Sequence, residues 1–197
     1  MPRPKSYDRA DAIERACYAF WEKGYRALGV RALQEAAGLN AFAIRTEFGG
    51  KEGLYLAALE LYASEAEREA MAPMKGGGLD TIIEFFENLV TEASPTSSQW
   101  GCLMVNTGIE NADIGSQKLA SRVQRYWESL AAHFRQALLH AAEVGDLRDT
   151  VNIDALAEGL VTAAMGIHSK NRSAGAHDAG RPMVDILRDY LESLRTS

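Results

Sequence analysis

Apolar residues recur along almost the whole chain at the spacing of amphipathic helices. Near the N-terminus, positions i, i+3, i+4, i+7 and i+8 of one apolar face are Ile13, Ala16, Cys17, Phe20 and Trp21. Asp8 is a suitable N-cap for this helix, and Gly24 is a suitable stop. No segment shows the alternation that is typical of a strand, and we find no internal repeat. The pattern predicts an all-α protein of about nine helices.

Two short helices are expected next, joined by a turn that contains Gly38. The first covers residues 30–37, with Val30, Leu33 and Ala37 facing inward. The second follows the N-cap Asn40 and is held inward by Ile44 and Phe48. Two short helices packed on a preceding helix form a helix-turn-helix, whose second helix reads the major groove of DNA. The side chains left facing outward are Asn40, Ala41, Phe42, Arg45 and Thr46.

The rest of the chain predicts longer helices. A helical pattern runs from Lys51 to about Met71, a flexible break covers residues 73–78, and further helices are expected over 80–93, 102–111, 116–144 and 152–169. Residues 94–101 and 170–181 are expected to be loops, and Pro182 suits the first turn of a last helix. We therefore expect a DNA-binding domain over residues 1–50 and a ligand-binding and dimerisation domain over 51–197, with helix 51–72 connecting them.

Charge and composition narrow the picture further. The formal net charge is −6, but residues 1–50 carry eight Lys/Arg and six Asp/Glu, whereas the remaining residues carry a net −8. A slightly basic head on an acidic body fits a protein that meets phosphate only through its N-terminal part. No apolar run reaches the length of a membrane helix, and no signal peptide is recognisable. Two cysteines are too few for a disulfide scaffold, so we expect a cytoplasmic protein.

Residues 9–60 carry a set of short motifs at family-specific spacing. They are Gly24-Tyr25, Val30-Arg31, Ala37-Gly38-Leu39-Asn40 and Phe48-Gly49-Gly50-Lys51-Glu52-Gly53-Leu54-Tyr55. On these residues the chain resembles the TetR family of transcriptional regulators. The segments 101–107 and 145–148 add a weaker likeness to the same family. The chain departs from the family pattern at Gly29 (usually Ser or Thr), Ala41 (Lys or Arg), Phe42 (small or Pro), Arg45 (often Tyr) and Glu47 (usually His).

The resemblance implies a repressor that a small-molecule effector releases from its DNA operator. Phosphate contacts are expected from Tyr25, Arg31, Lys51 and the arm Arg3–Ser6. Arg45 either reads a guanine or clamps a phosphate, and Phe42 can touch a thymine methyl. Glu47 either repels phosphate or pairs with a neighbouring arginine. An activator or a regulator without a ligand remains an alternative within this class.

The resemblance also implies a homodimer built by the last two helices. The expected interface residues are Leu156, Leu160, Ala163, Ile167, Ile186, Leu187, Tyr190, Leu191 and Leu194. These residues could instead only close the monomer core. A ligand pocket is expected among the middle helices, with candidate lining residues Phe86, Trp100, Cys102, Met104, Trp127, Phe134, Met165 and His168. Aromatic and Met residues at helical spacing are more often plain core.

Catalytic and metal chemistry find little support in the sequence. There is no nucleophile motif, no phosphate-cradling loop and no set of His, Cys and carboxylates at ligand spacing, so we expect no enzyme, no metal and no cofactor. A helical scaffold protein is a second alternative, but it would not need residues 24–55. Cys102 lies at a predicted helix start, where a reactive thiol sensor is possible and a small buried side chain is the more common outcome.

Overall fold

The computed structural model describes residues 7–92 and 97–196. Contacts divide the chain into two compact units. The first, here the head unit, is Met1–Ser64 with Asn106–Val123, and the second, the body unit, is Glu65–Val105 with Gln124–Ser197. The expected DNA-binding helices thus share a unit with a later segment of about eighteen residues, which periodicity alone did not indicate.

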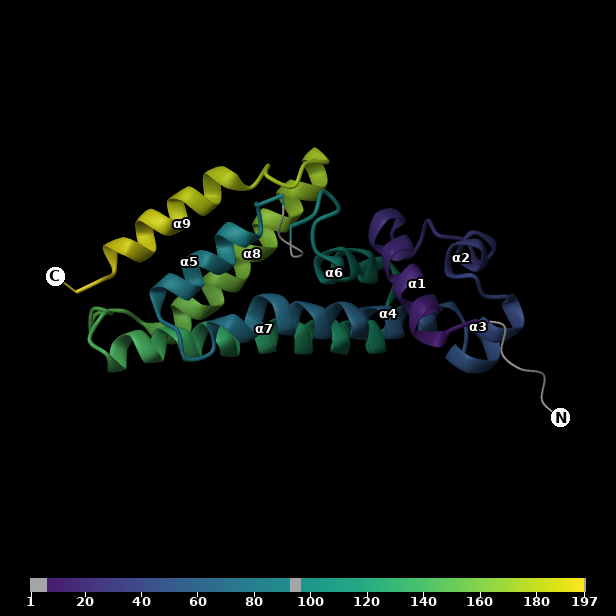
Figure 1. Ribbon diagram of the computed structural model, residues 1–197, viewed down its shortest axis with the longest axis horizontal. Helices are drawn as coiled ribbons and strands as arrows, with labels where there is room; N and C mark the ends of the chain where they lie inside the picture. Colours follow the sequence, from purple (N-terminus) through teal and green to yellow (C-terminus); the bar gives the residue numbers. More distant parts are fainter. Residues whose placement is uncertain (1–6, 93–96, 197) are drawn as a thin grey trace. The chain divides into compact units, whose positions relative to one another are not determined.

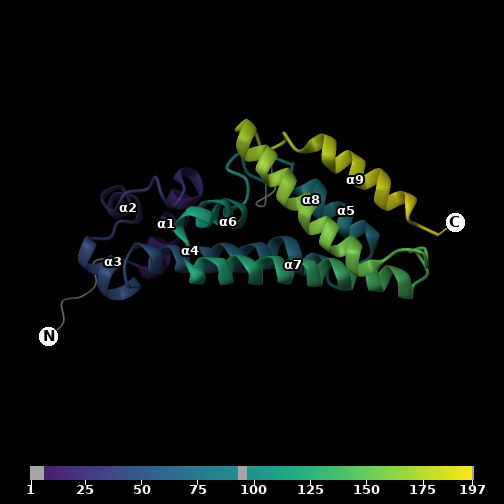
Figure 2. The same ribbon diagram turned by 180° about the vertical axis from the view of Figure 1, so that it is seen from behind.

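The described residues form nine α-helices (Figures 1 and 2). An isolated bridge between Leu147 and Arg195 is the β-type pairing found in the described part of the chain. The all-α prediction is therefore confirmed. The helices are α1 (Arg9–Lys23), α2 (Val30–Ala37), α3 (Ala41–Phe48), α4 (Lys51–Ala66), α5 (Leu79–Asn88), α6 (Leu103–Ile114), α7 (Gln117–Glu143), α8 (Ile153–Ala174) and α9 (Arg181–Ser193).

The head unit forms because α1 has a defined start and a continuous apolar face. The Asp8 side chain accepts hydrogen bonds from the backbone N–H groups of Ala10 and Asp11, and Gly24 ends the helix at φ 82°. The α1 residues that this places inward are Ala12, Ile13, Ala16, Cys17, Ala19 and Phe20. The Phe20 ring lies 4.5 Å from the ring of Tyr55, centroid to centroid, so α4 contributes to the same core.

The body unit has an aromatic core. The rings of Phe86 and Phe134 stack with centroids 5.7 Å apart, and Phe85 lies edge-on to both. Helix α9 packs against α5 and α8. Its buried stripe is Val184, Leu187 and Leu191.

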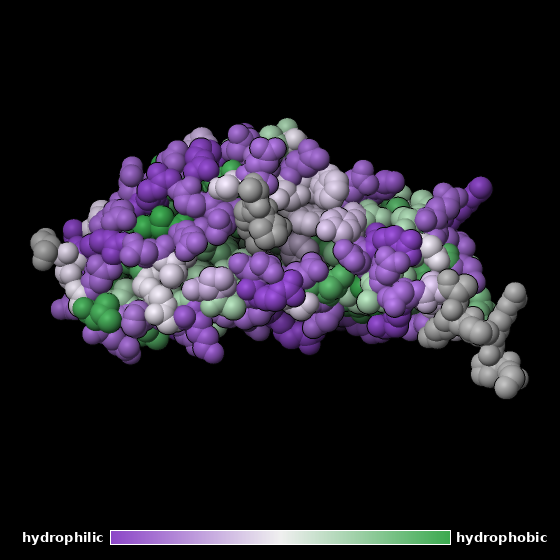
Figure 3. Space-filling model, in the orientation of Figure 1, coloured by the Kyte–Doolittle hydropathy of each residue, from purple (hydrophilic) through white to green (hydrophobic). Residues whose placement is uncertain are grey.

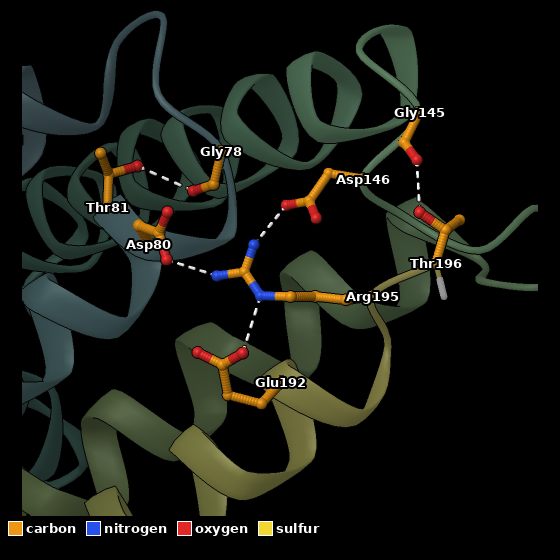
Figure 4. Close-up of polar contacts among 8 residues, drawn as sticks. All are labelled: Gly78, Asp80, Thr81, Gly145, Asp146, Glu192, Arg195 and Thr196. Carbon is orange, nitrogen blue, oxygen red and sulfur yellow. Dashed lines mark hydrogen bonds and ion pairs between the residues drawn. The ribbon is translucent and has the colours of Figure 1, made fainter.

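A cluster of ion pairs fastens the end of the body unit (Figure 4). The Arg195 guanidinium pairs with Asp80, lies 2.5 Å from Asp146 and lies 2.7 Å from Glu192. Backbone hydrogen bonds reinforce it, since Thr196 N donates to the Asp146 carbonyl at 3.1 Å. The chain after α9 is thereby tied to the turn after α7 and to the start of α5.

Several helices end differently from the sequence prediction. Helix α5 ends at Asn88 instead of near residue 93, and α6 continues to Ile114 instead of ending near residue 111. The expected continuous helix from Lys51 changes at Glu67–Met71 into a π-helical turn and then into a 3-10 turn, Ala72–Met74. Pro73 has no N–H to continue the regular ladder, which accounts for the change. Helix α8 continues to Ala174 instead of ending near residue 169, and Gly175 closes it at φ 63°.

The polarity of residues 170–174 suggested a loop. Instead these residues are helical, and the polar side chain of Asn171 is hydrogen-bonded within the protein. Asn171 is fully buried. Its Nδ2 donates to the Leu89 carbonyl, and its Oδ1 accepts from Gly180 N. The expected inward position of Val30 is also wrong, because Val30 is 46% exposed. It is the first residue of α2 and has helical neighbours on one side only. Of the loop predicted over 94–101, residues 94–96 lie outside the described residues.

Candidate nucleic-acid interface

Helix α3 is anchored by its capping residue and by two buried side chains. The Asn40 side chain accepts a hydrogen bond of 2.8 Å from Ala43 N, as its N-cap position predicted. Ala43 and Ile44 are buried against the head unit. The preceding turn is closed by Gly38 at φ 65°, a left-handed conformation that favours glycine. The opposite side of α3 therefore faces away from the core.

The five side chains predicted to face outward, Asn40, Ala41, Phe42, Arg45 and Thr46, are all exposed. Two of them are partly engaged: Asn40 caps the helix, and the Thr46 hydroxyl donates to the Phe42 carbonyl at 2.8 Å. Phe42 is 74% exposed, the largest value among the exposed large apolar side chains of the described residues. Single exposed apolar side chains are common on protein surfaces, so it is the place of Phe42 on the outward face of α3 that makes it a candidate contact.

Arg45 differs from the other described arginines of residues 7–64. Those four are engaged within the head unit: Arg15 pairs with Asp11, Arg26 with Asp113, Arg31 with Glu35, and Arg9 lies over the Phe48 ring. Within the described part of the chain, no ion pair or hydrogen bond is found for the Arg45 guanidinium. Its five donors are therefore available to a partner.

Glu47, at the end of α3, lies near Tyr7. Its carboxylate is close enough to the Tyr7 side chain to influence the pKa of the phenol. Burial first and Glu47 second raise the pKa of Tyr7 to about 12, so the phenol stays protonated. The predicted arm Arg3–Ser6 lies outside the described residues.

The three residues predicted to contact phosphate lie in different surroundings. Lys51 is half-buried, with its ammonium 4.4 Å from the centre of the Tyr25 ring, and burial lowers its pKa. Tyr25 is half-buried between Phe20 and Tyr55, and burial, followed by the charge of Glu52, raises its pKa. Arg31 is exposed and pairs loosely with Glu35 at 3.4 Å. Lys51 and Tyr25 form one cluster, from which Arg31 stands apart.

The sequence did not predict a set of hydrogen bonds and an ion pair that side chains of α6 make with the N-terminal part of the head unit. Glu110 Oε2 accepts hydrogen bonds from Tyr25 N at 2.8 Å and from Arg26 N at 3.1 Å. Asp113 pairs with the Arg26 side chain at 2.5 Å, and Thr107 Oγ1 lies 2.6 Å from the Tyr55 hydroxyl oxygen. These partners are more than 50 residues apart in the chain. The sequence does show a tyrosine in the N-terminal part and acidic residues in a later helix. This combination is too common to predict which residues contact each other.

The eight candidate pocket residues all lie in the body unit. Phe86 and Phe134 stack on each other, whereas Trp127 packs edge-on to Tyr126. Phe86, Cys102, Met104, Phe134 and His168 are buried, and Trp100, Trp127 and Met165 are half-buried. Full burial of five positions and half-burial of three suit either a closed pocket or plain core.

His168 is the chemically distinctive member of this set. Burial lowers its pKa to about 4, so the imidazole is neutral near pH 7. Its Nδ1 is buried and has no hydrogen-bond partner among the described residues. Cys102 is fully buried, which favours the space-filling role over a reactive thiol. A search of the described residues for three or more His, Cys, Asp or Glu side chains able to hold a metal finds no such group.

The predicted dimer residues divide into an inner and an outer set. The inner residues pack within the body unit itself and are Leu160, Ala163, Ile167, Leu187 and Leu191. Leu156 and Leu194 are half-buried, while Ile186 is 62% and Tyr190 48% exposed. A groove of about 450 Å³ lies beside them, lined by α8 and the start of α9 and including Gly159, Ala163, Gly166, Ile167 and Met183. None of the eight candidate pocket residues lines this groove.

Elsewhere the visible surface is mixed. On the face shown in Figure 3, hydrophilic residues predominate and apolar residues form small separate patches. No helix in the described ranges combines the length and the hydropathy that crossing a membrane requires.

Two family models match the chain in succession. Residues 12–58 match "Bacterial regulatory proteins, tetR family", and residues 78–186 match "Tetracyclin repressor-like, C-terminal domain". The first match covers the helix-turn-helix helices, and the second covers more than half of the chain.

Individual relatives agree with these matches. The HTH-type transcriptional repressor ComR of Escherichia coli (strain K12) is 32% identical over 107 residues, which span 53% of this chain and 51% of ComR. The HTH-type transcriptional repressor AcnR of Corynebacterium diphtheriae is 28% identical over 192 residues, or 98% of this chain and 95% of AcnR. The fold is similar to that of the TetR family regulator CifR, a cysteine mutant of which was solved with 26-base-pair operator DNA. The TM-score is 0.77 at 21% identity, covering 98% of this chain and 99% of CifR.

Proposed function

Because the chain belongs to the TetR family of bacterial regulatory proteins and is a DNA-binding transcriptional regulator, we propose that it is a repressor that a small-molecule effector releases from its operator. The observation that carries the proposal is the outward face of α3, where Phe42 and the unengaged Arg45 are presented on a helix anchored from behind. The relatives ComR and AcnR are both named as repressors, which supports repression instead of activation. The proposal gives no residue a catalytic role, and it places the protein in the cytoplasm with the DNA.

Operator contacts divide into two kinds. Side chains on the outward face of α3 meet base edges, while Tyr25, Arg31 and Lys51 meet phosphates at its margins. The Lys51 ammonium is held over the Tyr25 ring instead of moving freely, so less side-chain entropy is lost when a phosphate binds. Asn40 contributes mainly by capping α3.

A single head unit covers one half-site, so tight binding requires a two-fold dimer. The outer face of α9 supplies the apolar surface for it, with Met183, Ile186 and Tyr190 exposed beside the groove along α8. At glycines 159 and 166 of α8, an added Cβ would meet no atom within 4 Å, which leaves room for a close partner. The inner residues position this face from behind.

The functional division follows residues 1–50 for DNA and 51–197 for effector and dimerisation, with α6 as the link. Its first residues, Leu103–Val105, belong to the body unit, and the rest of the helix belongs to the head unit. Gly101, just before α6, is so close to the His168 carbonyl that a Cβ there would lie 2.5 Å from it. An effector that moves this segment would favour a different position of α6. The hydrogen bonds from Glu110 of α6 to Tyr25 N and Arg26 N would change with it.

The proposal is tested by fluorescence anisotropy of the full-length protein with DNA flanking its own gene, at several salt concentrations and with unlabelled competitor. A specific complex should lose affinity with salt as expected for several phosphate contacts. Lys51→Gln should reduce the salt slope by about one and weaken all DNA alike. Lys23→Gln, an exposed lysine at the end of α1, is the matched control. Absence of even non-specific binding at low salt would overturn the proposal.

A further inference from the structure

We infer that Phe42 and Arg45 act as a reading pair that selects a thymine and a guanine on neighbouring base pairs of each operator half-site. The inference rests on the proposed function, and it concerns which bases the recognition helix prefers.

The pair occupies the centre of the outward face of α3. Residues three apart on an α-helix are separated by about 60° around the axis and about 4.5 Å along it. That advance is close to the ~3.4 Å step between bases along one DNA strand. Ala41 and Thr46 flank the pair and are short. Short flanks let the helix approach the groove floor, so the two long side chains reach bases first.

Phe42 carries no group that can bind a phosphate or donate to a base. Its ring is 74% exposed, and nothing in the described head unit covers it. The 5-methyl of thymine is the one apolar group on a base edge in the major groove, and contact with it would remove both from water. Phe42 therefore discriminates thymine from cytosine, whose edge presents an amino group instead.

Arg45 complements this contact with a charged one. Its guanidinium is exposed and unengaged within the described residues, unlike that of Arg31, which already pairs with Glu35. A planar fork at the middle of the outward face matches the O6 and N7 acceptors of guanine. Residues at the margin of the helix are better placed for phosphate, and Lys51 and Tyr25 already serve there.

The test begins with an operator enriched from random DNA by the full-length protein. Affinities are then measured by anisotropy after each thymine is replaced with deoxyuridine, which removes only the methyl, and each guanine with 7-deazaguanine, which removes only N7. At one thymine, deoxyuridine should weaken wild type about fourfold, the value of one buried methyl-sized group, and should leave Phe42→Ala unchanged. At a guanine one step away, 7-deazaguanine should cost roughly tenfold in wild type and nothing in Arg45→Gln.

Both substituted residues are exposed, so their loss should not unfold the protein. Tyr18→Ala removes another exposed aromatic ring, 53% exposed, from α1, and it should keep both sensitivities of wild type. An operator that binds specifically but responds equally to the base changes in wild type and variants would overturn the inference alone. If the enrichment yields no preferred sequence, the proposed function fails together with it.

Discussion

The head and body units both engage most of their described arginines, and they differ in what lies beside an exposed one. In the body unit, arginines close the structure: Arg195 meets three carboxylates, and Arg181 and Arg188 both pair with Glu87. In the head unit, Arg45 is left without a described partner on the face of α3 that also exposes Phe42. The difference is that Arg45 shares its helix face with a large exposed apolar ring, which makes this face the part of the head unit best suited to meet another molecule.

The two units also differ in how their interiors are supported. The body core depends on aromatic stacking among Phe85, Phe86 and Phe134. The head adds a polar support, in which the Glu110 carboxylate accepts two backbone N–H groups of the turn after α1. Apolar packing is insensitive to direction, whereas hydrogen bonds fix orientation. The hydrogen bonds to Glu110 therefore fix the orientation of the turn after α1.

The largest effect is expected from the aromatic core of the body. Phe134→Ala should lower the free energy of unfolding by about 3–5 kcal/mol, since a fully buried ring is lost and a cavity remains. Urea unfolding followed by circular dichroism measures this. Leu139→Ala, at a 45% exposed position of the same helix, should cost far less. Similar losses for the two variants would show that the stacked rings are not the main support of the body.

A comparable effect should appear as pH dependence at His168. Burial lowers its pKa to about 4, below the ~6.5 of an unfolded chain, so the unfolded state binds more protons between these values. The contribution is fully present above pH ~6.5 and is lost as pH falls towards 4, by roughly 3 kcal/mol in total. His168→Gln, which cannot titrate, should remove this part of the pH dependence of unfolding. An unchanged profile would mean that the neutral imidazole is not buried in solution.

Local sequence patterns predicted the helix ends and the outward face of α3. They did not predict features that depend on contacts between residues far apart in the chain. Asp8, Gly24 and Asn40 act at the helix ends where the sequence placed them, because caps depend on a few neighbouring residues. The outward face of α3 also followed from spacing alone. The continuation of α8 past residue 169 did not, because it depends on Asn171 bonding to residues 82 and 9 positions away.

The same reason explains why the support for the head unit was overlooked. Glu110 acts on backbone groups 84 and 85 residues earlier, and no periodic pattern encodes such a pairing. The predicted dimer and pocket residues remain predictions. Helical spacing identifies an apolar face, but it cannot say whether that face meets the chain's own core, a second copy or a ligand.

A smaller effect is expected when the polar support of the head is removed. Glu110→Ala should lower stability by about 1–3 kcal/mol, because Tyr25 N and Arg26 N lose a charged acceptor. Glu110→Gln keeps an acceptor oxygen and should recover more than half of the loss. The control is Asp113→Ala, whose ion pair with Arg26 is largely exposed and should be worth less than ~0.5 kcal/mol. Equal losses for Ala and Gln would assign the effect to charge instead of hydrogen bonding.

The smallest effect on stability is expected at the ion-pair cluster around Arg195. Arg195→Ala should cost only about 1 kcal/mol in urea unfolding, because Asp80 is 85% and Glu192 49% exposed and water screens both pairs. The backbone bonds from Arg148 N to Leu194 O and from Thr196 N to Asp146 O survive the substitution and still tie down the chain end. The difference from wild type should shrink at 1 M salt, where the screening length is about 3 Å. Asp80→Asn should change stability by less than ~0.5 kcal/mol. A loss of about 3 kcal/mol or more in Arg195→Ala would be well above the usual contribution of exposed ion pairs. It would mean that this ion-pair cluster holds α9 in place, and not the buried residues Val184, Leu187 and Leu191. The body unit would then depend on directional polar contacts as much as the head does.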